Sequence, residues 1–130
     1  MKFIAAAALF AGIALSQTVV VNPSAAKWIN EAGSESVTLR EDPKTGALEL
    51  LVRYPAGHVF KPYWHTANER MVLIEGRISL RQGNGAETFL EPGGYAFLPA
   101  KEVQRTACVS KTRCSFYVYW DGKLDFQPAQ

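Results

Sequence analysis

The stretch that decides the fold runs from Gly57 to Gly76 and reads GHVFKPYWHTANERMVLIEG. Within it Tyr63 and His65 are two residues apart, so in a strand both side chains leave the same face. Glu69 follows His65 by four residues, across a loop-prone Thr-Ala-Asn segment that lets the chain turn. A phenol, an imidazole and a carboxylate are therefore expected to meet at one place.

Two interpretations of this cluster follow from its chemistry. An imidazole, a carboxylate and a phenol can hold a divalent metal, because imidazole suits iron, zinc, copper and nickel and a carboxylate oxygen balances the charge. Alternatively, His65 and Glu69 form a hydrogen-bonded pair in a polar pocket without any metal. The spacing alone leaves both interpretations open.

Runs of apolar, aromatic and β-branched residues flank this stretch, and turn residues separate them. Gly76 is expected to bend one run sharply, and Asn84-Gly85 predicts a hairpin turn. Short strands with frequent turns, and no amphipathic helical pattern, predict an all-β sandwich or barrel. The expected strands are residues 36–40, 48–54, 71–80, 87–90, 95–98, 103–108 and 115–120.

The length of 130 residues allows one domain. Lys2 is followed by thirteen residues without charge, a run too short for a comfortable membrane span, so residues 1–16 are predicted to be a cleaved signal peptide. A buried N-terminal helix is the alternative. Residues 17–35 are expected to form an extended arm and residues 36–126 the β-domain. The protein is accordingly expected to be exported, to the periplasm or the extracellular space.

The two cysteines, Cys108 and Cys114, are separated by five residues and can face each other on the strands of a hairpin. In an exported protein this spacing favours a structural disulfide over two free thiols. A metal-binding or catalytic role is disfavoured, because the spacing is not that of Cys-x-x-Cys sites.

The formal net charge is only +2, and the lysines and arginines are scattered among acidic residues. No basic stripe indicates nucleic acid, and nothing indicates a membrane surface once the leader is removed. Gly83, Gly85, Gly93 and Gly94 fall in expected turns with no helix after them, so no phosphate-binding loop is predicted.

The spacing in the opening stretch resembles the first motif of the cupin superfamily. That motif runs Gly, five residues, His-x-His, three or four residues, Glu, six residues, Gly. The chain fits it with Tyr63 in place of the first histidine, and the matching residues are Gly57, His65, Glu69 and Gly76.

A second cupin motif runs Gly, five residues, Pro-x-Gly, two residues, His. Gly93 and Pro99 match it, whereas Lys101 replaces the second glycine and Gln104 replaces the histidine. From Gly46 to about Asp125, the chain resembles the exported, single-domain cupins of bacteria.

The resemblance implies a single-domain, all-β fold, the cupin-type jelly-roll β-barrel. It places the family's metal shell on Tyr63, His65, Glu69 and Gln104, for iron, manganese, zinc, nickel or copper. Tyr63 would have to ligate as a phenolate, which needs a polarising ion because the usual pKa is near 10. Gln104 offers a neutral carbonyl oxygen, a poor ligand for such metals.

Three kinds of function remain open at this point. The first is a small-molecule metalloenzyme of the oxygenase or isomerase class, and the second is a metal-free cupin that binds a small polar ligand at the same four positions. The third is a structural homodimer that pairs through exposed strand edges.

Several aromatic side chains and one histidine are left without a definite place. His58 has the opposite strand parity to His65 and joins the cluster only if Pro62 introduces a bulge. Trp64 is expected to point to the opposite face. In the last strand, Tyr117 and Tyr119 share one face. The opposite face carries Phe116, Val118 and Trp120, and either face can point to the interior.

Overall fold

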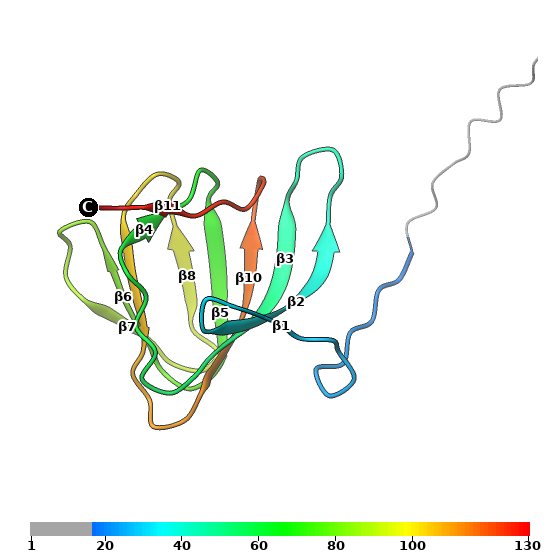
Figure 1. Cartoon of the computed structure of the whole chain (residues 1–130), viewed down its shortest axis with the longest axis horizontal. Helices are drawn as coiled ribbons and strands as arrows, with labels where there is room; N and C mark the ends of the chain where they lie inside the picture. The colour runs from blue at the N-terminus through cyan, green and yellow to red at the C-terminus, as the bar shows by residue number, and fades with distance from the viewer. Residues whose placement is uncertain (1–16) are drawn as a thin grey trace, which may run out of the picture.

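The strands of this computed structural model are arranged in two antiparallel sheets (Figure 1). The structure describes residues 17–130, so the predicted signal peptide at residues 1–16 lies outside the described part. The six-stranded sheet has the spatial order β1-β2-β3-β10-β5-β8, and the five-stranded sheet has the order β11-β4-β9-β6-β7. The strand bounds are β1 (Ile29–Glu31), β2 (Ser34–Glu41), β3 (Leu48–Tyr54), β4 (Tyr63–Trp64), β5 (Glu69–Glu75), β6 (Ile78–Gln82), β7 (Thr88–Leu90), β8 (Tyr95–Leu98), β9 (Gln104–Cys108), β10 (Cys114–Trp120) and β11 (Gln127–Pro128).

The chain crosses repeatedly between the two sheets. β5 belongs to the larger sheet, β6 and β7 to the smaller, β8 to the larger, β9 to the smaller and β10 to the larger. This order confirms the predicted all-β jelly roll, as two separately hydrogen-bonded sheets that do not close into one continuous barrel. Leu73, Ile78, Phe116 and Val118 are among the most buried side chains of the apolar core. In residues 17–130, no helix has the length and apolar character needed to span a bilayer.

Gly76 lies where the chain passes from β5 in the larger sheet to β6 in the smaller one. Its φ of 86° lies in the left-handed region, where a side chain is strained. A Cβ added there would also lie 2.6 Å from the carbonyl oxygen of Arg113 and 2.8 Å from Cys114 Sγ. Gly57, at the other end of the stretch, has a φ of 76° but open space around it. The predicted bend therefore requires glycine at position 76 for two separate reasons.

β10 lies between β3 and β5 in the larger sheet and presents alternate residues to the interior. Phe116, Val118 and Trp120 are buried, whereas Tyr117 and Tyr119 are half-buried on the outer face. The alternation in the sequence predicted two opposite faces, and the structure identifies the one that fills the core.

The segment predicted to be an extended arm contains a short strand. β1 pairs with the beginning of β2, and Ala32 and Gly33 form the turn between them with positive φ angles of 51° and 83°. The guanidinium carbon of Arg53 lies 3.7 Å from the ring centroid of Trp28. Strand pairing and this cation–π contact hold the segment against the larger sheet.

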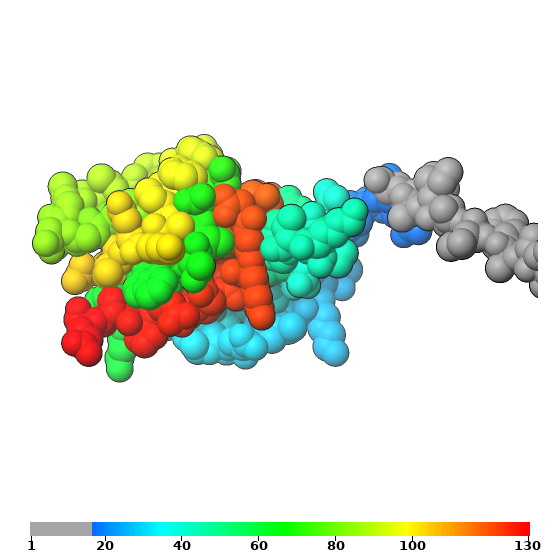
Figure 2. Space-filling view, turned by 90° about the horizontal axis from the view of Figure 1, so that it is seen from above, coloured from blue at the N-terminus to red at the C-terminus, as the bar shows by residue number. Residues whose placement is uncertain are grey.

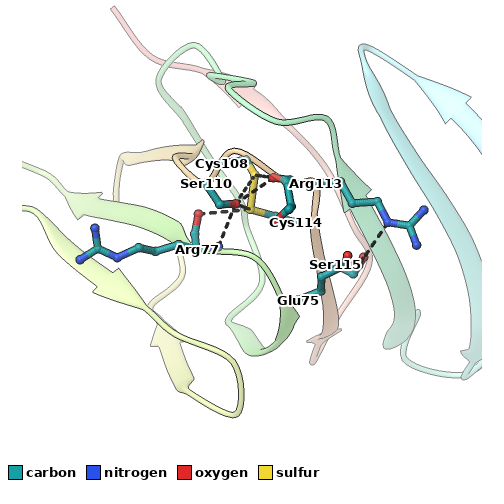
Figure 3. A network of polar contacts seen from close by, with 8 residues as sticks. Glu75, Arg77, Cys108, Ser110, Arg113, Cys114 and Ser115 are labelled. Atoms are coloured by element: carbon teal, nitrogen blue, oxygen red, sulfur yellow. Dashed lines mark hydrogen bonds and ion pairs between the residues drawn. A yellow bond between two sulfur atoms is a disulfide. The ribbon is translucent and has the colours of Figure 1, made fainter.

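The predicted disulfide between Cys108 and Cys114 is present, with Cα atoms 5.8 Å apart. It joins the end of β9 in the smaller sheet to the start of β10 in the larger one, so it links the two sheets covalently. The Ser110 hydroxyl lies 3.5 Å from each sulfur and donates a hydrogen bond of 2.8 Å to the Thr112 carbonyl (Figure 3). The backbone N–H of Arg77, next to the Gly76 bend, donates to the same hydroxyl at 3.1 Å.

We expect Gly76→Ala to lower the free energy of unfolding by about 3 kcal/mol, because left-handed strain adds to overpacking against the backbone of Arg113. Gly57→Ala is the matched control, where only the strain of about 1 kcal/mol applies. Urea denaturation of the two variants measures the difference. Equal losses in both would contradict the close approach at Gly76.

We expect the double variant Cys108→Ala/Cys114→Ala to lose about 2 kcal/mol of stability, the chain-entropy contribution of so short a closed loop. Adding a reductant should destabilise the wild-type protein by a similar amount and leave the double variant unchanged. Denaturation curves with and without reductant test this. A wild-type protein that is indifferent to reductant would show that the bridge adds no stability.

Candidate functional site

A cavity of about 390 Å³ lies beside the inner face of β3 and β10. Most of its wall is apolar or aromatic, and none of its lining residues is a lysine or arginine. Its polar groups include Tyr63, His65 and Glu69, from β4, the residue after it and the start of β5. A larger, more open surface hollow of about 910 Å³, next to the N-terminal segment, contains none of the predicted site residues. The cavity is therefore the candidate site.

The structure brings together all four residues that the sequence singled out. Tyr63 and Gln104 are direct partners across β4 and β9. His65 Nε2 lies 3.3 Å from Glu69 Oε2, and Gln104 Nε2 donates to the same oxygen at 3.3 Å. All four side chains are buried, with His65, Glu69 and Gln104 no more than 3% exposed. The phenol, imidazole and carboxylate meet as the spacing predicted.

His65 is held from its other side by the C-terminal segment. Its Nδ1 donates to the backbone carbonyl of Asp125, and the Asp125 carboxylate accepts hydrogen bonds from the N–H and hydroxyl of Thr66, at 2.8 and 2.5 Å. Figures 1 and 2 show this segment running beside β4, with which β11 pairs. Both ring nitrogens of His65 therefore face oxygen acceptors.

The environment of His65 raises its pKa. Burial alone would lower the pKa, but the hydrogen bond and charge of Glu69, with the Asp125 carbonyl, outweigh it. A pKa above the usual value favours an imidazolium, whose two N–H groups match the two acceptors. The geometry is that of a buried imidazolium–carboxylate pair.

Tyr63 stays a neutral phenol. Burial and the negative charge of Glu69 raise its pKa well above the usual value for tyrosine, and burial also raises the pKa of neighbouring Tyr54. The Tyr63 hydroxyl is hydrogen-bonded to the hydroxyl of Thr106 at 3.2 Å. It offers the cavity a hydroxyl rather than a phenolate.

The donor set does not fit a transition metal. Burial and the charge of Glu69 raise the pKa of Tyr63 and so disfavour a phenolate ligand, and Gln104 donates its amide N–H to Glu69. Only His65 and Glu69 remain as ligands, one short of the three protein ligands typical of catalytic zinc sites. Among residues 17–130, no cluster of three His, Cys, Asp or Glu side chains is placed to bind a metal. This chemistry favours the metal-free pair that the spacing also allowed.

The remaining histidine lies apart from the pair. His58 packs edge-on against Phe60, with ring centroids 4.3 Å apart, and its ring approaches Gly33 in the β1–β2 turn. Trp64 is half-buried between two more buried neighbours, as its position in a strand predicted. Neither side chain lines the cavity.

Much of the cavity wall comes from residues that no sequence pattern singled out. Leu124 and Phe126 come from the C-terminal segment, which has no periodic pattern, and the β1–β2 turn also contributes. Tyr54 and Trp120 follow the two-residue alternation of their strands, but alternation alone does not show which of the two faces of a strand points to the interior. The aromatic and aliphatic lining consists of Leu50, Val52, Tyr54, Phe60, Tyr63, Phe116, Trp120, Leu124 and Phe126.

We expect His65 to titrate above pH 6.5, the usual pKa of histidine, because Glu69 stabilises the imidazolium. Glu69→Gln should lower the pKa of His65, because burial lowers this pKa and the charge that offsets burial is removed. Glu75→Gln, which removes a carboxylate outside the cavity, should leave the pKa of His65 unchanged. NMR titration of the imidazole proton measures both. The wild-type stability contributed by His65 should be complete below about pH 6.5 and be lost as the pH rises through the folded-state pKa. A wild-type pKa at or below 6.5 would contradict the pair.

Comparison with known proteins gives one sequence relative among curated proteins and many structural ones. The relative is the DNA damage-repair/toleration protein DRT102 of Arabidopsis thaliana, 32% identical over 94 residues. The match covers 72% of this chain but 28% of the relative, so the chain spans little more than a quarter of that protein's length.

The structural relatives share the fold. The polyketide cyclase RemF from Streptomyces resistomycificus superposes with a TM-score of 0.72 at 16% identity, over 88% of this chain and 87% of that one. The DMSP lyase DddQ from Ruegeria pomeroyi gives a TM-score of 0.66 at 17% identity, over 82% and 61%. At such identities the likeness extends to the fold alone.

The sequence also matches the family described as the ChrR cupin-like domain, over residues 16–122. This match covers most of the chain and includes both motifs from which the resemblance was drawn. The chain belongs to the ChrR cupin-like family of the cupin superfamily.

Proposed function

We propose that this cupin domain binds a small, largely apolar molecule in its cavity and needs no resident metal to do so. The observation that carries the proposal is the buried His65–Glu69 pair in the wall of a largely apolar cavity of about 390 Å³. Ligand cavities in proteins are typically concave and mostly apolar, with a few convergent polar groups that fix orientation.

The aromatic part of the wall is continuous. Tyr54 and Phe60 have ring centroids 4.4 Å apart, and Phe60 and Tyr63 are 6.1 Å apart. His65 lies 4.8 Å from Phe126 and 5.6 Å from Trp120. Such a surface favours a flat, ring-containing ligand over a sugar or an aliphatic acid, because aromatic rings add specific packing to apolar burial.

The polar groups favour a ligand that carries an oxygen atom. The contacts of Glu69 with His65 and Gln104 both fall on Oε2, so Oε1 can accept a hydrogen bond from a ligand hydroxyl. The Tyr63 hydroxyl is a second possible partner. Hydrogen bonds between the ligand and this buried charged pair would also be stronger than hydrogen bonds between two neutral groups.

Two features support an exported location. The Cys108–Cys114 bridge is of the kind that persists in oxidising compartments, and the predicted signal peptide points the same way. We propose that the domain acts in the periplasm or outside the cell.

We expect the purified protein to contain far less than one metal ion per chain and to be thermally stabilised by a bicyclic aromatic alcohol or ketone such as 1-naphthol or 1-tetralone. His65→Gln should weaken binding of 1-naphthol by at least about tenfold, because Glu69, which accepts the hydrogen bond from the ligand hydroxyl, loses the buried partner that orients its carboxylate. His58→Gln, at the chain's other histidine, should leave it unchanged.

Elemental analysis and calorimetric titration provide these measurements. A metal content close to one ion per chain would refute the metal-free site. Failure of all such probes to bind, or equal affinities in the two histidine variants, would refute the ligand-binding role of the pair.

A further inference from the structure

A second hollow, of about 330 Å³, lies against the smaller sheet and is lined mostly by residues of β6, β9 and the segment that leads into β4. Of the described residues, Phe60 alone lines both this hollow and the cavity described above. The hollow contains two arginines, Arg81 and Arg105, and both are exposed. A ligand in the solvent can therefore reach two guanidinium groups here.

Arg81 and Arg105 are direct partners across β6 and β9, so their side chains leave the same face of the sheet side by side. Like charges directly opposite each other in a sheet are unfavourable. In the described part of the chain neither guanidinium has an ion-pair partner, whereas Arg77 and Arg113 each pair with a glutamate. Arg105 Nη1 donates to the Gly83 carbonyl at 3.0 Å, which is a neutral acceptor. Two positive charges are therefore held next to each other with no carboxylate in contact with either.

One carboxylate, that of Glu87, also lines the hollow. It accepts a hydrogen bond from the Ser79 hydroxyl instead of pairing with an arginine. The two guanidinium groups and this carboxylate leave one excess positive charge, which matches a monoanion. A phosphate dianion would be repelled by Glu87 more strongly than a singly charged carboxylate.

The hollow also has an apolar side. Val59 is 71% exposed, and Pro62 belongs to the same segment. Val59 forms a β-bridge with Ala107. The Phe60 N–H donates to the Thr106 carbonyl at 3.0 Å, so the segment is held beside β9. An apolar group of a ligand would cover exposed apolar surface here, which is favourable.

We infer that this hollow binds a small organic monocarboxylate. Its carboxylate lies between Arg81 and Arg105, and its apolar part lies against Val59 and Pro62. Arginine suits this role because the planar guanidinium can bind both oxygens of a carboxylate. The volume is at the low end of the range of about 300–1,000 Å³ typical of small-molecule sites, which favours a free acid over a polypeptide. The inference does not depend on the proposed function of the cavity.

The first test is an NMR titration of the wild-type protein at low ionic strength, because salt screens exposed charges. The probes are benzoate, the uncharged benzyl alcohol and inorganic phosphate. Benzoate should bind most tightly and should shift the side-chain Nε–H signals of Arg81 and Arg105. Tighter binding of phosphate, equal binding of benzyl alcohol, or benzoate shifts confined to other residues would overturn the inference.

The second test compares Arg81→Gln with Arg40→Gln, which replaces an exposed arginine of β2 and changes the net charge equally. Arg81→Gln should weaken benzoate binding by about fivefold to tenfold, because a charge-assisted contact is lost. Arg40→Gln should keep the wild-type affinity. Without ligand, Arg81→Gln should be at least as stable as the wild type, since it removes the repulsion by Arg105. Equal affinities in the two variants, or a Tm of Arg81→Gln well below that of the wild type, would contradict the site.

Glu87→Gln tests the choice of a monoanion. It should strengthen binding of phosphate more than binding of benzoate, because the group that repels a dianion is removed. A ratio of the two affinities equal to that of the wild type would refute this choice. Tighter binding of a tripeptide ending in phenylalanine than of benzoate would identify a peptide terminus and overturn the free acid. These variants leave His65 and Glu69 unchanged, so a failure here leaves the proposed function of the cavity standing.

Discussion

The structure around the cavity depends on the burial of one charged pair. An imidazolium and a carboxylate removed from water are stable only when further hydrogen bonds satisfy their remaining atoms. Here Gln104 reaches Glu69 from β9, and the Asp125 carbonyl reaches His65 from the C-terminal segment. The pair therefore determines which parts of the chain have to meet at this place, and the aromatic wall forms around it.

The two departures from the cupin motifs are spatial neighbours. Tyr63 and Gln104 stand where the resemblance places histidines, and they are paired directly across β4 and β9. Tyr63 bonds to Thr106 and Gln104 to Glu69, so each polar side chain has a partner within the protein. At these two positions a hydrogen-bonded network stands where the cupin motifs have histidines, within the same fold.

Local patterns in the sequence predicted most of the strands but not β1 or β11, and they predicted the bend at Gly76, the disulfide and the meeting of Tyr63, His65 and Glu69. Each of these depends on residues close together in the chain or on a fixed two-residue alternation. The contacts of Asp125 and Phe126 with His65 depend on where the C-terminal segment packs against the sheets. This segment has no periodic pattern, so its position could not be predicted from the sequence.

The hydrogen bond from His65 to the Asp125 carbonyl joins residues 60 positions apart. His65 lies near the middle of the chain, and it obtains its acceptor only after almost the whole domain has been synthesised. Most of the core strands can already be paired at that stage. The wall of the cavity is therefore complete only when residues 124–126 have been added and have docked.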